Sequence, residues 1–162
     1  MDKHQQGHKE TINQPQHHDR DTAHQHIAGS ALCPGCGAHY KAGRWAWPQG
    51  TDSQAQSVTC PACRRIADND PAGNLVLSGD FVQAHREDLL NLIRNTEAKE
   101  QQDHPLERLI AISEEADRVL VSTTGTHLAN RIGHALESAF DGCVMYSYTA
   151  NETHLDVTWR RD

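Results

Sequence analysis

Cys33-Pro34-Gly35-Cys36-Gly37 and Cys60-Pro61-Ala62-Cys63 are the two stretches that decide how the first half of this chain folds. Each contains a Cys-x-x-Cys pair, and four thiolates arranged two and two suit a tetrahedral site for a soft metal ion. The spacing therefore predicts that Cys33, Cys36, Cys60 and Cys63 bind one structural Zn²⁺ and leave no open position for water. Gly37 is expected to relieve the tight turn after the first pair.

Two other interpretations of the cysteine pairs remain open. A redox dithiol uses the same motif, but neither pair lies in the β-α-β pattern typical of such proteins. Iron also accepts four cysteine ligands, as in rubredoxin-like sites. The sequence has no apolar signal segment at its start and no apolar run near the ~20 residues that span a bilayer. We therefore expect a cytoplasmic protein with reduced thiols and no membrane partner.

The composition of the 162-residue chain indicates that part of it is unpacked, since the hydrophobic content is 36% and the mean hydropathy is −0.72. Residues 1–31 are rich in Gln and His and are expected to form a disordered tail, because they have little apolar surface to bury. The tail's histidines either bind metal weakly or are incidental. The net charge of −7 counts against tight, non-specific binding to bare nucleic acid, but allows docking on a preformed ribonucleoprotein.

Residues 32–80 are predicted to form the zinc ribbon. Aromatic side chains at Tyr40, Trp45 and Trp47 favour a strand within 40–47, and a polar loop follows it. Residues 68–73 have the composition of a turn, and 74–79 are expected to form a short strand.

Residues 81–162 are predicted to form an α+β domain in the order β-α-(α)-β-α-β-β, with helices on one face of a small sheet. Thr126 is the expected N-cap of the last helix, and Cys143 is expected to be a buried, small apolar residue. The same order occurs in small RNA-binding domains such as the C-terminal domain of initiation factor three, an analogy of fold alone. Helices are expected at 81–102, 105–116 and 127–140, and strands at 119–124, 143–149 and 154–159.

Basic and aromatic residues near the second cysteine pair are candidate contacts with RNA. Arg64 and Arg65 follow this pair directly, although ion pairs with Asp68 or Asp70 are an alternative. Trp45 is placed to stack on a base or to fill the core of the ribbon.

The segment around residue 127 supplies the other candidate contacts. Free N–H groups at Gly125 and Thr126 would suit a phosphate, unless they only cap the helix. His127, Arg131 and His134 recur at helical spacing, so they would face either a phosphate backbone or solvent.

Enzyme motifs are missing from the sequence. It contains no Gly-x-x-x-x-Gly-Lys-Ser/Thr, His-Glu-x-x-His, Gly-x-Ser-x-Gly or Gly-x-Gly-x-x-Gly. We therefore expect a protein that is not an enzyme.

Three stretches together resemble known families: 60–66 with 71–73 and 79–81, 104–108, and 121–136, which contains Thr-Thr-x-x-His-Leu-Ala-x-Arg-Ile-Gly. The chain resembles an uncharacterised bacterial group of small zinc-ribbon proteins. Over 32–160 it is also similar to the zinc-binding family of the large-subunit ribosomal export adaptor, first named for nonsense-mediated mRNA decay. The resemblance implies association with the ribosome or with RNA. That adaptor family is longer and has more cysteine pairs, and Asn130 stands here where a second basic residue is frequent.

Two functions follow from these observations. The leading hypothesis is a non-enzymatic zinc-ribbon protein that binds structured RNA or the ribosome. The alternative is a protein–protein adaptor that uses the ribbon as a rigid platform, which the acidic charge favours. One continuous basic patch around Arg64, Arg65, His127 and Arg131 would support RNA binding, and scattered charge would support the adaptor.

Overall fold

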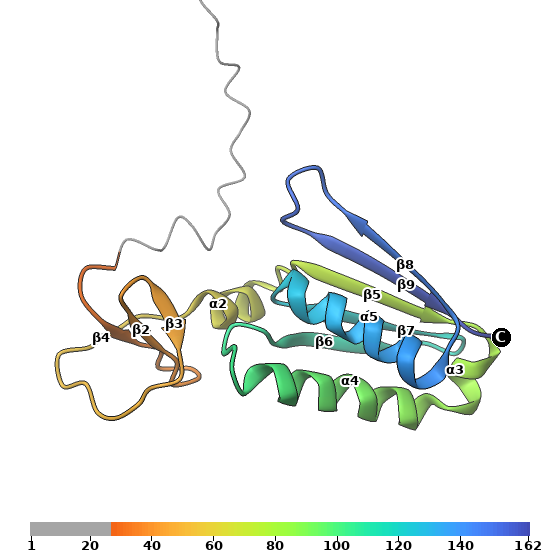
Figure 1. Ribbon diagram of the computed structural model, residues 1–162, viewed down its shortest axis with the longest axis horizontal. Helices are drawn as coiled ribbons and strands as arrows, with labels where there is room; N and C mark the ends of the chain where they lie inside the picture. Colours follow the sequence, from red (N-terminus) through yellow and green to blue (C-terminus); the bar gives the residue numbers. More distant parts are fainter. Residues whose placement is uncertain (1–26) are drawn as a thin grey trace, which may run out of the picture.

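The computed structural model describes residues 27–162 and contains two sheets (Figure 1). The first sheet and one short helix make up residues 31–68, the part called here the cysteine unit. The second sheet and three helices make up residues 73–160, the part called here the sheet domain. The chain is thus α+β, as expected. Most of the expected tail, up to residue 26, lies outside the described residues.

The cysteine unit has a sheet of four very short strands in the order β3-β2-β1-β4. β2 and β3 form an antiparallel hairpin, and β1 pairs antiparallel with β2 and parallel with β4. Because so few backbone hydrogen bonds and side chains connect these strands, other contacts must stabilise the unit. The strands are β1 (Ala31–Leu32), β2 (His39–Lys41), β3 (Arg44–Ala46) and β4 (Gln56–Ser57).

Helix α2 (Pro61–Asp68) starts inside the second cysteine pair, where the sequence predicts no helix. Cys60 is its N-cap, and the Sγ atom of Cys60 accepts a hydrogen bond from the N–H of Cys63 at 3.3 Å. Pro61 suits the first helical position, and Asn69 ends the helix in the left-handed conformation with φ of 50°. Eight residues give too short an apolar pattern for periodicity to reveal the helix.

The sheet domain has five strands in the order β6-β7-β5-β9-β8. β5 lies at the centre, antiparallel to β7 and parallel to β9, and the outer pairs are antiparallel. The central strand β5 starts at Gly73, which lies within the range 32–80 that the sequence assigns to the ribbon. The strands are β5 (Gly73–Ser78), β6 (Leu109–Glu114), β7 (Arg118–Thr123), β8 (Cys143–Tyr148) and β9 (Leu155–Arg160).

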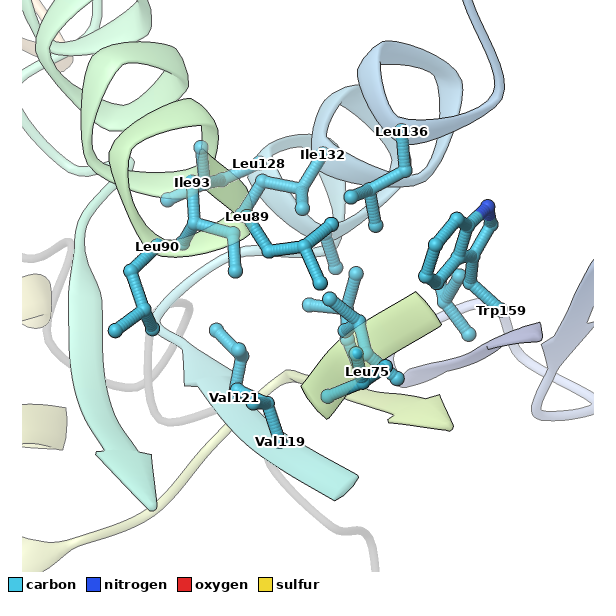
Figure 2. Close-up of a cluster of buried hydrophobic side chains, with 14 of the residues drawn as sticks. Leu75, Leu89, Leu90, Ile93, Val119, Val121, Leu128, Ile132, Leu136 and Trp159 are labelled. Atoms are coloured by element: carbon cyan, nitrogen blue, oxygen red, sulfur yellow. The ribbon is translucent and has the colours of Figure 1, made fainter. Parts of the chain in front are cut away.

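Helices α3 (Asp80–Ala84), α4 (Arg86–Gln101) and α5 (Thr126–Phe140) cover one face of this sheet (Figure 1). The expected helix at 81–102 is divided at His85, which ends α3 and precedes α4. Figure 2 shows side chains of α4 and α5 pointing at those of the central strands. The labelled residues are Leu75, Leu89, Leu90, Ile93, Val119, Val121, Leu128, Ile132, Leu136 and Trp159, all of them buried.

The expected helix at 105–116 is wrong, because residues 109–114 form the edge strand β6. Leu109 pairs with Thr123 and Ala111 with Ser122, so Ile110 is an extra residue in a β-bulge. The bulge breaks the alternation that would have indicated a strand and leaves apolar residues at helix-like spacing. The β-branched residues and the pairing with β7 decide the strand conformation.

The odd cysteine, Cys143, is exposed, which corrects the expectation of a buried residue. It begins β8 and pairs with Arg160 on the face of the sheet that the helices do not cover. The next residue, Val144, pairs with the buried Trp159, so the alternation of the strand directs Cys143 outward.

The cysteine unit contacts the sheet domain through named side chains. The indole N–H of Trp47 donates a hydrogen bond of 2.6 Å to the backbone oxygen of Gln101, at the end of α4. Arg108, just before β6, donates from Nη1 to the Sγ atom of Cys63 at 3.1 Å. Leu106 packs against the buried residues around the cysteines. Residues 102–108, the connecting loop, therefore lie against the cysteines.

Candidate metal centre

The four predicted ligands, Cys33, Cys36, Cys60 and Cys63, converge in the cysteine unit. Their four Sγ atoms all lie within 4.8 Å of one another, and those of Cys36 and Cys60 are 3.6 Å apart. In a tetrahedral site with Zn–S bonds of about 2.3 Å, neighbouring sulfurs are about 3.8 Å apart. All four cysteines are free thiols without a disulfide. The cluster thus has the ligand type, number and spacing that one zinc ion requires.

The first cysteine pair lies in a tight turn after β1. The N–H of Gly37 donates to the carbonyl of Cys33 at 2.9 Å, and Gly37 has φ of 80°. This left-handed conformation confirms the role expected for that glycine. A Cβ atom at Gly35 would lie 3.1 Å from the Sγ atom of Cys63, so the turn passes very close to the second pair.

Backbone N–H groups point at the sulfurs. The N–H of Cys60 donates to Sγ of Cys33 at 3.2 Å, while the N–H of Cys63 donates to Sγ of Cys60. Burial raises the pKa of the Cys33 thiol, but backbone hydrogen bonds from Cys60, Cys36 and Gly35 outweigh it and bring the pKa to about 6. Cys33 is therefore a thiolate at neutral pH.

Burial has the opposite net result at two other cysteines. It raises the pKa of Cys60 far above the ordinary value, and the charges of Cys36 and Cys63 raise it further. Burial likewise raises the pKa of Cys36. Four buried thiolates would repel one another, so a divalent cation is needed to keep all four deprotonated.

Arg108 adds a positive charge from the sheet domain. Burial lowers the pKa of its guanidinium, but the hydrogen bond to Cys63 and the charges of the cysteines raise it above the ordinary value. Arg108 thus neutralises part of the negative charge of the sulfurs. The sequence includes it in the resemblance at 104–108 without giving it a role, because the contact joins residues far apart along the chain.

The candidate RNA contacts next to the second cysteine pair turn inward. Arg65 is buried, and its Nη1 lies 3.5 Å from a carboxylate oxygen of Asp70 and donates to the carbonyl of the same residue. Arg64 is half-buried on α2. Trp45 is half-buried as well, with its ring 5.4 Å from that of Tyr40 and against the buried cysteines. Trp45 therefore contributes to the core of the unit.

The start of α5 already has a negative group of the chain's own. Helix α5 begins at Thr126, and its N-cap is Gly125 rather than Thr126. The N–H of Leu128 donates to a carboxylate oxygen of Glu107 at 3.0 Å. A Cβ atom at Gly125 would overlap that carboxylate, so a larger residue there would displace Glu107 from the start of the helix. Glu107 occupies the place where the sequence predicts a phosphate.

His127 and Arg131 share one acidic partner. The Nε2 atom of His127 lies 2.9 Å from Oε2 of Glu100, and Nε of Arg131 lies 3.3 Å from Oε1 of the same carboxylate. His134 lies farther along α5 with its ring 5.1 Å from that of Tyr146. The three candidate contacts on α5 therefore have partners within the chain: a shared carboxylate for His127 and Arg131, and an aromatic ring for His134.

Two basic residues that the sequence analysis missed lie on the β2–β3 hairpin. Lys41 pairs directly with Arg44 across the turn, and both side chains are exposed. Within residues 27–162, no acidic side chain forms an ion pair with either of them. The signal in the sequence was the Lys-Ala-Gly-Arg string between aromatic residues, which is typical of a hairpin turn with a basic tip.

Comparison with protein-family models, with curated proteins and with solved structures found no match for this chain. Across the described range, 27–162, the helices are all too short or too polar to cross a membrane.

Proposed function

We propose that the four cysteines bind one Zn²⁺ and that the cysteine unit is a zinc ribbon with a structural role. The proposal is supported by the free thiols, the sulfur spacing and the contact of Arg108 with Cys63. Four thiolates fill the coordination shell of zinc, so this ion would have no position for a substrate. Free thiols also suit the cytoplasm, which is the compartment we propose.

We propose further that the protein is a non-enzymatic adaptor that binds a protein partner. The observation that supports this most is that the candidate contact residues have acidic partners within the chain: Asp70 pairs with Arg65, and Glu100 contacts both His127 and Arg131. A nucleic-acid phosphate would have to displace these carboxylates. With a net charge of −7, the chain also offers phosphate little long-range attraction. Trp47 and Arg108 join the two parts of the molecule, which supports a rigid platform.

The test of this proposal is capture by the full-length chain with and without nuclease. We expect the same protein to be retained after nuclease treatment, and its purified form to bind with little dependence on salt. Cys36→Ser should abolish the binding, and Cys143→Ser, which changes an exposed thiol outside the cluster, should not. Loss of every captured component on nuclease treatment would contradict the adaptor.

A second candidate function, RNA or ribosome binding, is favoured by one observation. Lys41 and Arg44 are exposed and pair with each other at the tip of the β2–β3 hairpin, which is part of the cysteine unit. If they bind phosphate, Lys41→Gln with Arg44→Gln should weaken RNA binding and lower the salt slope by about 2. The matched control is Arg118→Gln with Arg160→Gln, two exposed arginines that already have carboxylate partners. Equal RNA affinity in both double variants would exclude the hairpin.

A further inference from the structure

A second group of metal-ligating side chains lies where the connecting loop meets α4 and α5. Glu100 comes from the last turn of α4, His104 from the loop, and His127 from the first turn of α5. One ligand atom from each lies within 4.8 Å of the other two. The rings of the two histidines are 5.7 Å apart and nearly perpendicular, at 74°. The end of α4 and the loop after it thus bring one carboxylate and one imidazole to a second imidazole from α5, more than twenty residues further along the chain.

This ligand set is a familiar one for divalent metals with an open coordination position. Two histidines and one carboxylate bind catalytic Zn²⁺ and also non-haem Fe²⁺. Ligand atoms around such an ion are about 3.3 Å apart. Nε2 of His127 and Oε2 of Glu100 are already 2.9 Å apart, and the three ligand atoms all lie within 4.8 Å of one another, so binding needs a small adjustment of the side chains. His104 and His127 are exposed and can make this adjustment by rotating about their side-chain bonds.

A cavity beside the two histidines gives room for a fourth ligand. Its volume is about 240 Å³. Three protein ligands do not complete the shell of a zinc ion, and water usually occupies the remaining position. The cavity is lined by Trp45, His104, Pro105, Leu106, Glu107 and His127.

A neighbouring cation orients the carboxylate of Glu100. Arg131 contacts Oε1 at 3.3 Å, whereas Oε2 faces His127 at 2.9 Å. One oxygen is therefore held by a supporting residue and the other points at the ligand cluster. Such supporting contacts fix the orientation of ligands in metal sites. The Glu100 side chain is 13% exposed, so it is also partly shielded from water.

We propose that Glu100, His104 and His127 bind a second divalent cation, of which Zn²⁺ fits the ligand set best, with one coordination position open to the cavity. This site is separate from the four cysteines and goes beyond the adaptor function, which needs no open metal. The connecting loop that supplies His104 also supplies Arg108, which donates a hydrogen bond to Cys63, so the same loop contacts both sites.

The test is a Zn²⁺ titration of the full-length chain, starting with one equivalent bound, followed by NMR of the histidine ring nitrogens. We expect the ring signals of His104 and His127 to shift together. Histidines in residues 1–26 can also bind Zn²⁺, so the ring signals of His104 and His127 are assigned by their loss in His104→Gln and His127→Gln. If Zn²⁺ leaves the rings of His104 and His127 unchanged while other histidines respond, the contacts with Glu100 are only ion pairs and the proposal is wrong.

Variants give an independent measurement of the same site. His104→Gln, His127→Gln and Glu100→Gln should each weaken the second binding event at least tenfold, while the first equivalent binds as before. His134→Gln is the matched control, since it changes an exposed histidine of the same helix outside the cluster. Arg131→Gln should weaken the second event about tenfold without changing the number of ions bound. Equal second-site affinity in His104→Gln and His134→Gln would overturn the proposal, and this result would not affect the adaptor test.

Discussion

The cysteine unit and the sheet domain differ in what their side chains bury. In the sheet domain, aliphatic residues of three helices and three strands form one continuous core, together with Trp159. In the cysteine unit, the buried cluster consists of two cysteines and two alanines, with Trp45 and Trp47 packed at its edge. Burial of a large aliphatic side chain is worth about 1.5–3 kcal/mol, and an alanine much less. The sheet domain can therefore fold by hydrophobic burial, whereas the cysteine unit buries little apolar surface and, as we propose, depends on a bound metal.

The largest expected effect comes from removing one sulfur ligand. In Cys36→Ser the cysteine unit should unfold, because binding at structural zinc sites supplies about 10–16 kcal/mol of apparent free energy. Circular dichroism and zinc content measured on the purified variant should show loss of the bound ion and of part of the strand signal. Cys143→Ser is the control, with normal zinc content expected. If Cys36→Ser loses its metal but melts like the unchanged protein, the cysteine unit does not depend on zinc for its fold.

A cavity in the core of the sheet domain should destabilise that domain and leave the zinc content of the cysteine unit unchanged. Ile132→Ala removes a fully buried side chain of α5 and should lower the free energy of unfolding by about 2–5 kcal/mol. The zinc content of the folded protein should stay at one ion per cysteine cluster. Urea unfolding measures the first quantity and metal analysis the second, with the exposed Ser138→Ala as control. Zinc loss in folded Ile132→Ala would show that the two parts are not independent.

Zinc affinity should fall steeply as the pH falls below neutrality. Cys33 is already a thiolate at neutral pH, because its pKa is about 6, but burial keeps the pKa of Cys36 and Cys60 raised. Zinc binding must therefore release protons from Cys36 and Cys60, which weakens binding about a hundredfold for each pH unit of acidification. Calorimetry in buffers of different ionisation enthalpy measures the protons released. A pH-independent affinity between pH 6 and 8 would contradict the assigned thiol states.

The same pKa shifts give metal-free Cys33 a defined effect on stability. Its folded-state pKa lies below the unfolded value, so its contribution is fully present above the unfolded pKa and is lost as the pH falls toward about 6. Cys60 acts in the opposite direction, since its pKa is raised in the folded state. Between about pH 6 and the ordinary thiol pKa, Cys33 therefore favours the folded state, and the opposing effect of Cys60 appears only above that ordinary pKa.

The smallest effect is expected at the contact between the two parts. Arg108→Gln removes the guanidinium that donates to Cys63 and should weaken zinc binding about tenfold. The fold of the sheet domain should be unchanged. Competition with a chromophoric chelator measures the affinity, with Arg94→Gln on the exposed side of α4 as the charge-matched control. Equal affinities in the two variants would mean that Arg108 only packs beside the sulfur.

Prediction from the sequence was most successful where the signal was local or strictly periodic. Cys33, Cys36, Cys60 and Cys63 are brought together as expected, and the strands β8 and β9 and the helix α5 lie close to their predicted ranges. It failed at α2, which is too short to show a period, and at β6, where the bulge at Ile110 gives a strand the spacing of a helix. In both places, contacts with distant segments decide the conformation.

The candidate surface was predicted less well, for a related reason. The sequence shows that His127 and Arg131 are polar and share a helix, but it cannot show that Glu100 lies between them. Likewise, nothing local places Glu107 at the start of α5 or Arg108 at Cys63. Such pairings arise only when the connecting loop folds against both parts of the molecule.

Hydrogen exchange of the full-length chain with and without a chelator tests the central claim most directly. If zinc holds the cysteine unit together, removal of the ion should abolish the protection of amides in residues 31–68 and leave those of β5, β7 and α5 protected. Protection that stays the same in both parts, or is lost in both together, would contradict the account.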